Sequence, residues 1–230
     1  MLQKTRGIAL NFIKYKETSI ISRIYTEEYG LQSYLVNGVR SSKKKRSAGK
    51  IAFFQPFSLL EMVVYYKKDA NLKRISELKC SHQLHHIPGD IRKSSVVLFL
   101  TEALIRILKE DDPDQKLFKF LTESIIFLEH SKKDFENFHL QFLLKASQFL
   151  GFGPSSGKEL QFELKSQNIK VVEFRDEIID RLLADDFGVY LKMTNNERSH
   201  LLDAIVNMFR LHFDNLGELR SMQVLRAVMH

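Results

Sequence analysis

The chain has 230 residues, 44% of them hydrophobic and 27% charged, with one cysteine, no tryptophan and a formal net charge of +7. This apolar content is enough for a folded core, and a single cysteine excludes both an internal disulfide and a multi-cysteine metal site. No apolar run approaches the roughly 20 residues of a membrane span, and the first residues lack the apolar centre of a signal peptide, so we expect a cytoplasmic protein.

The first 80 residues predict short β-strands. Alternation over Ile8–Phe12 is typical of a strand with one buried face. Further apolar runs follow at Ser19–Thr26, Leu31–Val36, Ile51–Tyr66 and Leu72–Leu78, with Asn37-Gly38 as a turn and Pro56 as a bulge or edge position. Five strands with a longer connection between the third and fourth favour an oligonucleotide-binding (OB) barrel, and an SH3-like barrel remains the alternative.

The rest of the chain predicts helices. Helical spacing begins after Gly89-Asp90 and recurs over four further segments, with Asp111-Asp112-Pro113 and Gly151–Pro154 as breaks. The predicted helices cover Val97–Leu108, Asp114–Glu129, Asp134–Leu150, Asn196–Phe213 and Glu218–Val228. Residues 158–194 are irregular, with a strand fragment at Val171–Phe174 and a short helix at Asp176–Ala184. We therefore predict a multi-domain α+β protein with a five-stranded OB-type barrel (1–80) and a mainly α-helical domain (81–230).

The positive charge is concentrated in the predicted barrel. Residues 1–80 carry a formal charge of +10 and residues 81–230 carry −3, and Val39–Lys50 holds six basic residues and no acidic one. This concentration of positive charge favours a polyanionic binding partner, either nucleic acid or an anionic membrane surface. A solvated loop would also be Lys-rich, but the remainder of the barrel is basic too. The predicted nucleic-acid contacts are Lys4, Arg6, Lys14, Lys16, Arg23, Tyr34, Arg40, Lys43, Lys44, Lys45, Arg46 and Lys50.

Tyr34 is in this set because exposed rings can stack on unpaired bases. It is chosen from eight aromatic residues near the strands, most of which we expect in the core. They are Phe12, Tyr15, Tyr25, Tyr34, Phe53, Phe54, Tyr65 and Tyr66. Nothing in the basic segment indicates base reading, so we expect weak sequence preference.

No pattern indicates catalysis or a cofactor. His82, His85 and His86 could share a metal, with Cys80 nearby, but a histidine-rich connector is the simpler interpretation. Asp111, Asp112 and Asp114 are better explained by helix capping than by metal binding. The chain contains no phosphate-binding loop, nucleophile elbow or dinucleotide fingerprint. We expect a protein that is not an enzyme, without metal or cofactor.

Short segments spread over about 190 residues resemble one family. They occur in matching order and spacing, and residues 158–194 lie outside them. The segments are Lys4–Ile8, Tyr25–Leu31, Tyr34–Arg40, Phe54–Pro56, Ile91–Ser94, Leu98–Glu102, Asn137–Leu144, Leu150–Phe152 and Leu216–Ser221. On these the chain resembles RecO, a bacterial mediator of recombination and DNA repair, in the form found in Bacteroidetes-type bacteria.

The resemblance implies an N-terminal OB domain, a helical C-terminal domain, and binding of single- and double-stranded DNA with annealing of complementary strands. It also implies partnership with RecR and with the acidic tail of the single-stranded-DNA-binding protein, so that RecA can load. Some family members carry a four-cysteine zinc site, which this chain lacks; residues 158–194 would replace that region.

An acidic tail would need a basic rim beside an apolar pocket. Candidates in the helical domain are Leu219, Arg220, Met222 and Arg226, although an amphipathic helix packed on the core would look the same. Other functions compatible with the sequence are a non-catalytic scaffold whose basic barrel binds RNA or an acidic protein, and a membrane-surface adaptor.

Overall fold

The computed structural model describes residues 1–39, 50–67, 70–170 and 172–229. It divides into two compact units, one formed by Met1–His85 with Thr101–Thr122 and the other by His86–Leu100 with Glu123–His230. Within the described residues, no helix is both long enough and apolar enough to cross a membrane.

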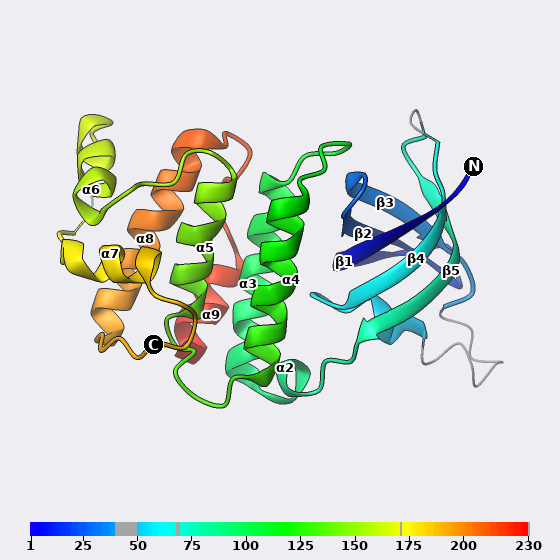
Figure 1. Ribbon diagram of the computed structural model, residues 1–230, viewed down its shortest axis with the longest axis horizontal. Coiled ribbons are helices and arrows are strands. Elements are labelled where there is room, and N and C mark those ends of the chain that lie inside the picture. Colours follow the sequence, from blue (N-terminus) through cyan, green and yellow to red (C-terminus); the bar gives the residue numbers. More distant parts are fainter. Residues whose placement is uncertain (40–49, 68–69, 171, 230) are drawn as a thin grey trace. The chain divides into compact units, whose positions relative to one another are not determined.

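The first unit contains a closed barrel with strand order β1-β2-β3-β5-β4 (Figure 1). Its strands are β1 (Leu2–Tyr15), β2 (Ser19–Thr26), β3 (Gly30–Val36), β4 (Leu59–Tyr65) and β5 (Lys73–His82). The long β1 pairs antiparallel with β4 through its first half and with β2 through its second half. β3 closes the barrel by pairing in parallel with β5. This is the arrangement of an OB barrel, which confirms the predicted fold class.

The predicted fourth strand is wrong over its first part. Lys50–Phe54 forms a 3-10 helix (η1), and β4 begins only at Leu59. Phe57 adopts a left-handed φ of 67° directly after Pro56, so the chain turns there instead of remaining extended. Phe54 is fully buried and joins the barrel core. The apolar run therefore supplies a core residue from a helical turn.

Residues of the α3–α4 connection pack on the β2–β3 turn within the first unit. The helices are α3 (Ile91–Ile107) and α4 (Gln115–His130). Gly30 has a φ of +63°, and a side chain at Gly30 would place Cβ 2.7 Å from backbone atoms of Asp112. A residue without a side chain is thus required at Gly30. The Asp114 side chain caps α4 by accepting the Leu117 amide at 2.9 Å, which confirms the predicted capping role of this acidic residue.

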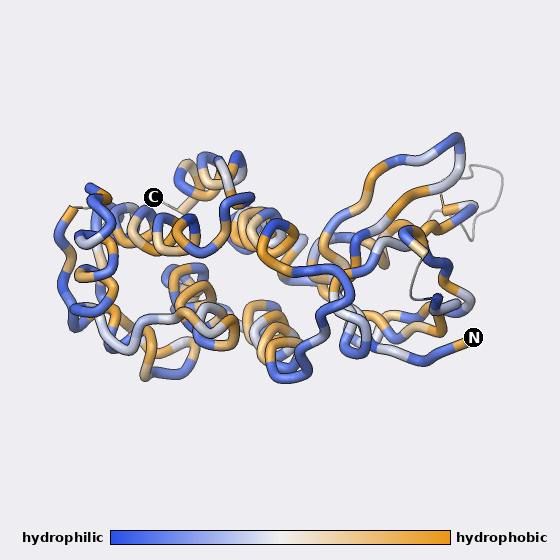
Figure 2. The backbone as a smooth tube through the Cα atoms, turned by 90° about the horizontal axis from the view of Figure 1, so that it is seen from above, coloured by the Kyte–Doolittle hydropathy of each residue, from blue (hydrophilic) through white to orange (hydrophobic). Residues whose placement is uncertain are grey.

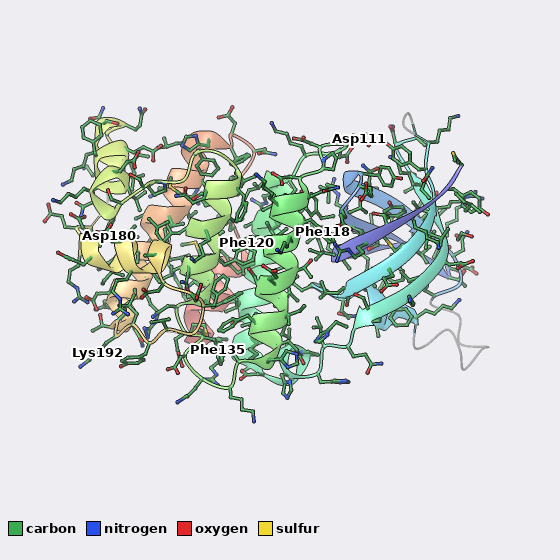
Figure 3. All side chains as sticks on the ribbon, viewed as in Figure 1. Asp111, Phe118, Phe120, Phe135, Asp180 and Lys192 are labelled. Atoms are coloured by element: carbon green, nitrogen blue, oxygen red, sulfur yellow. The ribbon has the colours of Figure 1, made fainter. Side chains whose placement is uncertain are left out.

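Phe118 lies on the side of α4 that faces the barrel (Figure 3). Its ring centroid is 6.2 Å from that of Tyr25, and the Arg6 guanidinium lies 5.5 Å from the same centroid. Tyr25 also accepts a hydrogen bond from the Asp114 amide at 3.3 Å. Burial raises the pKa of the Tyr25 hydroxyl to about 12. Part of the outer barrel surface is therefore buried.

The second unit is helical. Besides the first part of α3 and the last part of α4, it contains α2 (His86–Gly89), α5 (Phe138–Phe149), α6 (Gly157–Ser166), α7 (Asp176–Ala184), α8 (Asn195–His212) and α9 (Ser221–Met229). Apolar and polar residues alternate around these helices (Figure 2). α5 is buried along most of its length. This helical unit confirms the second part of the predicted fold class, in which a mainly α-helical domain follows the barrel.

Residues 158–194 are more regular than predicted. They include most of α6, whose N-cap is Ser156, and α7 with the predicted bounds Asp176–Ala184. The predicted strand fragment is wrong at residues 172–174, which form no strand, and Val171 lies outside the described residues. A run of four residues, three of them apolar, is too short a signal to distinguish a strand from an extended connection.

Candidate nucleic-acid interface

Two of the predicted contacts lie beside the turn between β1 and β2. Lys14 pairs with Ile20 and Tyr15 pairs with Ser19, so the strands separate at Lys16. Lys16 has a φ of 50°, and its ammonium lies 5.5 Å from the centroid of the Tyr15 ring. Both lysines are exposed. They are point charges at a protruding turn and can reach a phosphate without moving the barrel.

Arg23 lies on the outward face of β2. It is opposite Asn11 of β1 and Ser33 of β3, and it is half-buried. Its two cross-strand neighbours are polar and uncharged. This outward position keeps the guanidinium available to an external anion.

The basic segment leaves the barrel near these lysines. Val36, at the end of β3, pairs with Ile20, and the Ser19 hydroxyl donates a 2.9 Å hydrogen bond to Oδ1 of Asn37. The chain is described again from Lys50, which is exposed. The predicted contacts Arg40, Lys43, Lys44, Lys45 and Arg46 lie outside the described residues. The described cations Lys14 and Lys16 therefore neighbour the start of the most basic segment.

Lys4 and Arg6 lie elsewhere, in a hollow of about 530 Å³ on the outer surface of β1, β4 and β5. Its charged lining comprises Lys4, Arg6, Lys79, Glu27, Glu28, Glu61 and Glu77. Lys79 pairs with Glu61 at 2.8 Å. Since carboxylates outnumber cations there, a phosphate polymer would meet repulsion in this hollow. The structure thus separates Lys4 and Arg6 from the other predicted contacts.

Arg6 is engaged by Glu27 in a two-pronged ion pair. Nε of Arg6 donates at 2.7 Å to one carboxylate oxygen, and a terminal nitrogen donates to the other. The hydrogen bond from Arg6 lowers the pKa of Glu27, and the hydrogen bond to Glu27 raises the pKa of Arg6. Arg6 therefore has a partner within the chain before any ligand arrives.

Tyr34 is not the exposed ring that the sequence predicts. It pairs with Ser22 and Lys73 on the inner face of the barrel and is fully buried. Burial also raises the pKa of its hydroxyl, which has no hydrogen-bond partner among the described residues. Residues of β3 alternate in direction, and closure of the barrel turns Gln32 and Tyr34 inward. Tyr34 cannot stack on a base.

The exposed rings of the barrel are Tyr15 and Tyr65, which are 37% and 52% exposed. Sequence reasoning missed them because most aromatic residues near these strands were expected in the core. Their exposure follows from the register of β1 with β2, which the sequence alone does not give: Tyr15 shares the face of Ile13 and Arg23, opposite to that of the buried Ile20 and Ile24.

The residues of the second unit that were predicted to bind an acidic protein tail differ in solvent exposure. Leu219 is buried, Met222 is half-buried and Arg220 is exposed. Arg226 donates to the carboxylate of Asp203. Arg220 and Met222 are the members of this set whose side chains are at least partly exposed.

The histidine cluster is held by other contacts. The Cys80 thiol donates to the carbonyl of His82 at 2.9 Å. His86 Nδ1 lies 3.0 Å from the buried carboxylate of Glu129, which also accepts the amides of His86 and Ile87. In the part of the chain that the structure describes, no three His, Cys, Asp or Glu side chains are grouped to hold a metal ion.

Comparison with known proteins identifies relatives over the whole chain. Residues 1–84 match the family model "Recombination protein O N terminal", and residues 88–160 match "Recombination protein O C terminal". A DNA repair protein RecO from Phocaeicola vulgatus is 34% identical over 243 aligned residues, covering 99% of both chains. A DNA repair protein RecO from Flavobacterium johnsoniae is 32% identical, covering 98% of both.

Proposed function

The chain belongs to the RecO family of DNA repair proteins, and from this premise we propose that it binds single- and double-stranded DNA through its barrel as a recombination mediator. In this proposal it catalyses no reaction. It anneals complementary strands and, with RecR, helps RecA to load onto DNA coated by the single-stranded-DNA-binding protein. It acts in the cytoplasm, associated with the nucleoid.

The observation that carries the proposal is the segregation of charge. Residues 1–80 carry +10 and the remainder of the chain carries −3. Lys14 and Lys16 are exposed at the β1–β2 turn, beside the point where the basic segment leaves β3. A positive field confined to one barrel attracts phosphate polymers and releases their counterions on binding.

Annealing requires that two strands approach although their phosphates repel each other. Lysine ammonium groups on long side chains reduce this repulsion without reading bases. The basic segment Val39–Lys50 contains no acidic residue that would oppose this screening. Weak sequence preference is expected for the same reason.

The acidic tail of the single-stranded-DNA-binding protein would dock on the second unit. Arg220 offers an exposed cation, and Met222 offers a half-buried apolar surface next to it. In this proposal Leu219 supports the site from the core, and Arg226 contributes after exchanging its Asp203 partner.

A salt titration tests the DNA-binding proposal. Affinity for a fluorescent oligo-dT is measured by anisotropy over a range of NaCl concentrations, for the wild type and for Lys43, Lys44, Lys45 and Arg46 replaced together by Ala. We expect affinity to fall steeply with salt. The quadruple variant should flatten the log–log slope by about 0.7 for each phosphate that is no longer neutralised.

Two outcomes would contradict this. Unchanged binding by the quadruple variant would remove the basic segment from the interface. A wild type that ignores DNA at low salt but binds RNA or an acidic peptide would favour the scaffold function instead.

A further inference from the structure

The pair Asn37-Gly38 follows β3, where the chain leaves the barrel for its basic segment. The last cross-strand pair of β3 joins Val36 to Ile20, so strand pairing holds neither Asn37 nor Gly38. Both residues are exposed, and Gly38 has a left-handed φ of 70°. A Cβ at Gly38 would meet no atom of the described residues within 4 Å. The surroundings of Gly38 are therefore open.

One hydrogen bond orients the side-chain amide of Asn37. The Ser19 hydroxyl donates to Oδ1 of Asn37 at 2.9 Å. In the part of the chain that the structure describes, neither Nδ2 of Asn37 nor the backbone N–H of Gly38 makes a hydrogen bond. A donor on Oδ1 stabilises negative charge on that oxygen and so makes the side-chain carbon Cγ easier to attack. The neighbouring backbone nitrogen can make this attack without first breaking a hydrogen bond.

We propose that Asn37 is a site of spontaneous modification, at which the side-chain amide is converted to a carboxylate with the Ser19 hydroxyl as positioning group. The Gly38 nitrogen attacks Cγ of Asn37 and forms a new N–C bond, which closes a succinimide ring. The Cγ–Nδ2 bond breaks, and Nδ2 leaves as ammonia with the proton that the Gly38 nitrogen gives up. Water then opens the ring at either carbonyl, which yields aspartate or isoaspartate. No oxidation or reduction occurs, and water is the co-reactant.

The residue after the asparagine makes this site selective. Glycine has no Cβ, so the nitrogen of Gly38 can approach the Asn37 side chain closely. The chain contains no second Asn-Gly pair. Asn71 is also exposed, but Leu72 follows it, and a branched side chain at that position crowds ring closure. Exposure alone therefore does not make an asparagine of this chain reactive, and Asn71 is a control within the same molecule.

The product places a negative charge where the basic segment begins. Ser19 pairs with Tyr15, so the modified side chain lies beside the β1–β2 turn that carries Lys14 and Lys16. Isoaspartate also adds one methylene group to the main chain between β3 and the buried Val39. A carboxylate there repels phosphate, so modification should weaken the binding of DNA. This consequence rests on the proposed DNA-binding function, whereas the covalent change does not.

Timed incubation of the full chain at mildly alkaline pH tests the chemistry. Peptide mapping by mass spectrometry follows the mass gained when an amide becomes a carboxyl group, and chromatography separates the aspartate and isoaspartate peptides. Asn37 should convert to both products while Asn71 in the same digest stays an amide. Asn37→Gln should stay unconverted over the same time, because the longer side chain closes a ring far more slowly, and Gly38→Ala should slow conversion.

The Ser19 variants test its positioning role. Ser19→Ala should slow conversion of Asn37, and Ser19→Thr, which keeps a hydroxyl, should restore it. Conversion of Asn37 no faster than that of Asn71 would overturn the site. Equal rates in Ser19→Ala and the wild type would overturn the role of Ser19. Gly38→Ala is strained at the left-handed φ, but Asn37→Gln keeps this glycine and stays informative if Gly38→Ala does not fold.

Anisotropy with fluorescent oligo-dT tests the consequence separately. Converted wild type and fresh Asn37→Asp should bind about two- to fivefold more weakly than fresh wild type, as expected for one unit charge near a phosphate in water. Asn37→Gln should bind like fresh wild type before and after incubation. Complete conversion without loss of affinity would overturn the effect on DNA binding. If fresh wild type binds no DNA, the proposed function fails, and the mass measurement still decides whether Asn37 is modified.

Discussion

Gln32 donates a 2.8 Å hydrogen bond from Nε2 to Oδ1 of Asp111, which lies 79 positions later in the chain. Lys73 of β5, almost fully buried, places its ammonium 3.8 Å from the same oxygen and donates to the carbonyl of Ala70 at 3.1 Å. One carboxylate in the α3–α4 connection (Figure 3) thus joins β3 to β5, where the barrel closes.

Asp111→Ala should therefore destabilise the first unit. The Gln32 amide loses an acceptor and the buried Lys73 ammonium loses its counter-ion, at a cost of about 1–3 kcal/mol. Asp111→Asn should cost less because it keeps an acceptor for Gln32 and tolerates the left-handed φ of 54°. Urea denaturation measures the free energy of unfolding. Asp112→Ala, next to it and exposed, should stay within about 0.5 kcal/mol of wild type; equal losses in both alanine variants would contradict the role of Asp111.

The Arg6–Glu27 pair predicts a dependence of stability on acid. The hydrogen bond from Arg6 holds the pKa of Glu27 below its ordinary value of 4.5. A depressed carboxyl pKa contributes stability above the ordinary value, and that contribution is lost as the pH falls through the folded-state pKa. Glu27→Gln should thus be less stable than wild type near neutral pH, and the difference should shrink in acid. Denaturant titrations across this range measure it.

The control for that prediction is Glu28→Gln, since Glu28 has no ion pair among the described residues. Its difference from wild type should not depend on pH in the same way. A Glu27→Gln difference that stayed constant from neutral to acidic pH would show that the ion pair does not contribute.

Tyr34→Phe should stabilise the protein, by about 1 kcal/mol or more. It removes a buried hydroxyl that has no hydrogen-bond partner among the described residues and leaves the ring in place. Tyr25→Phe should have the opposite sign and cost about 0.5–1.5 kcal/mol, because the Asp114 amide loses its acceptor. Thermal unfolding of the two variants in parallel tests this; a destabilised Tyr34→Phe would be evidence that the hydroxyl has a partner.

Two double variants with equal charge changes should separate the basic surfaces of the barrel. Lys14→Ala with Lys16→Ala should weaken oligo-dT binding and flatten its salt dependence by up to about 0.7 for each phosphate that these lysines neutralise. Lys4→Ala with Lys79→Ala removes two cations from the carboxylate-lined hollow and should change neither quantity appreciably. Anisotropy titrations at several salt concentrations measure both. Similar losses in the two double variants would mean that long-range charge, and not position, governs binding.

Most of the order of strands and helices follows from sequence periodicity, although α6 (Gly157–Ser166) was not predicted. β2 (Ser19–Thr26) and α7 (Asp176–Ala184) have the predicted bounds, because a period of two or of 3.6 is a local property of the chain. The segregation of positive charge and the family resemblance are also readable without coordinates. Together they determine the fold class and indicate a nucleic-acid partner.

Only the tertiary structure decides which side of each strand faces outward. Tyr25 is buried against Phe118 of α4 on the outer surface of the barrel, so β2 carries apolar residues on both faces. The residue pattern of β2 therefore does not show which of its faces points into the barrel. Closure of the barrel then turns Tyr34 inward and exposes Tyr15 and Tyr65. It also places Arg6 beside Glu27, 21 positions away, and removes it from the cations near Lys14. Such pairings depend on register between distant strands, which the local sequence does not encode.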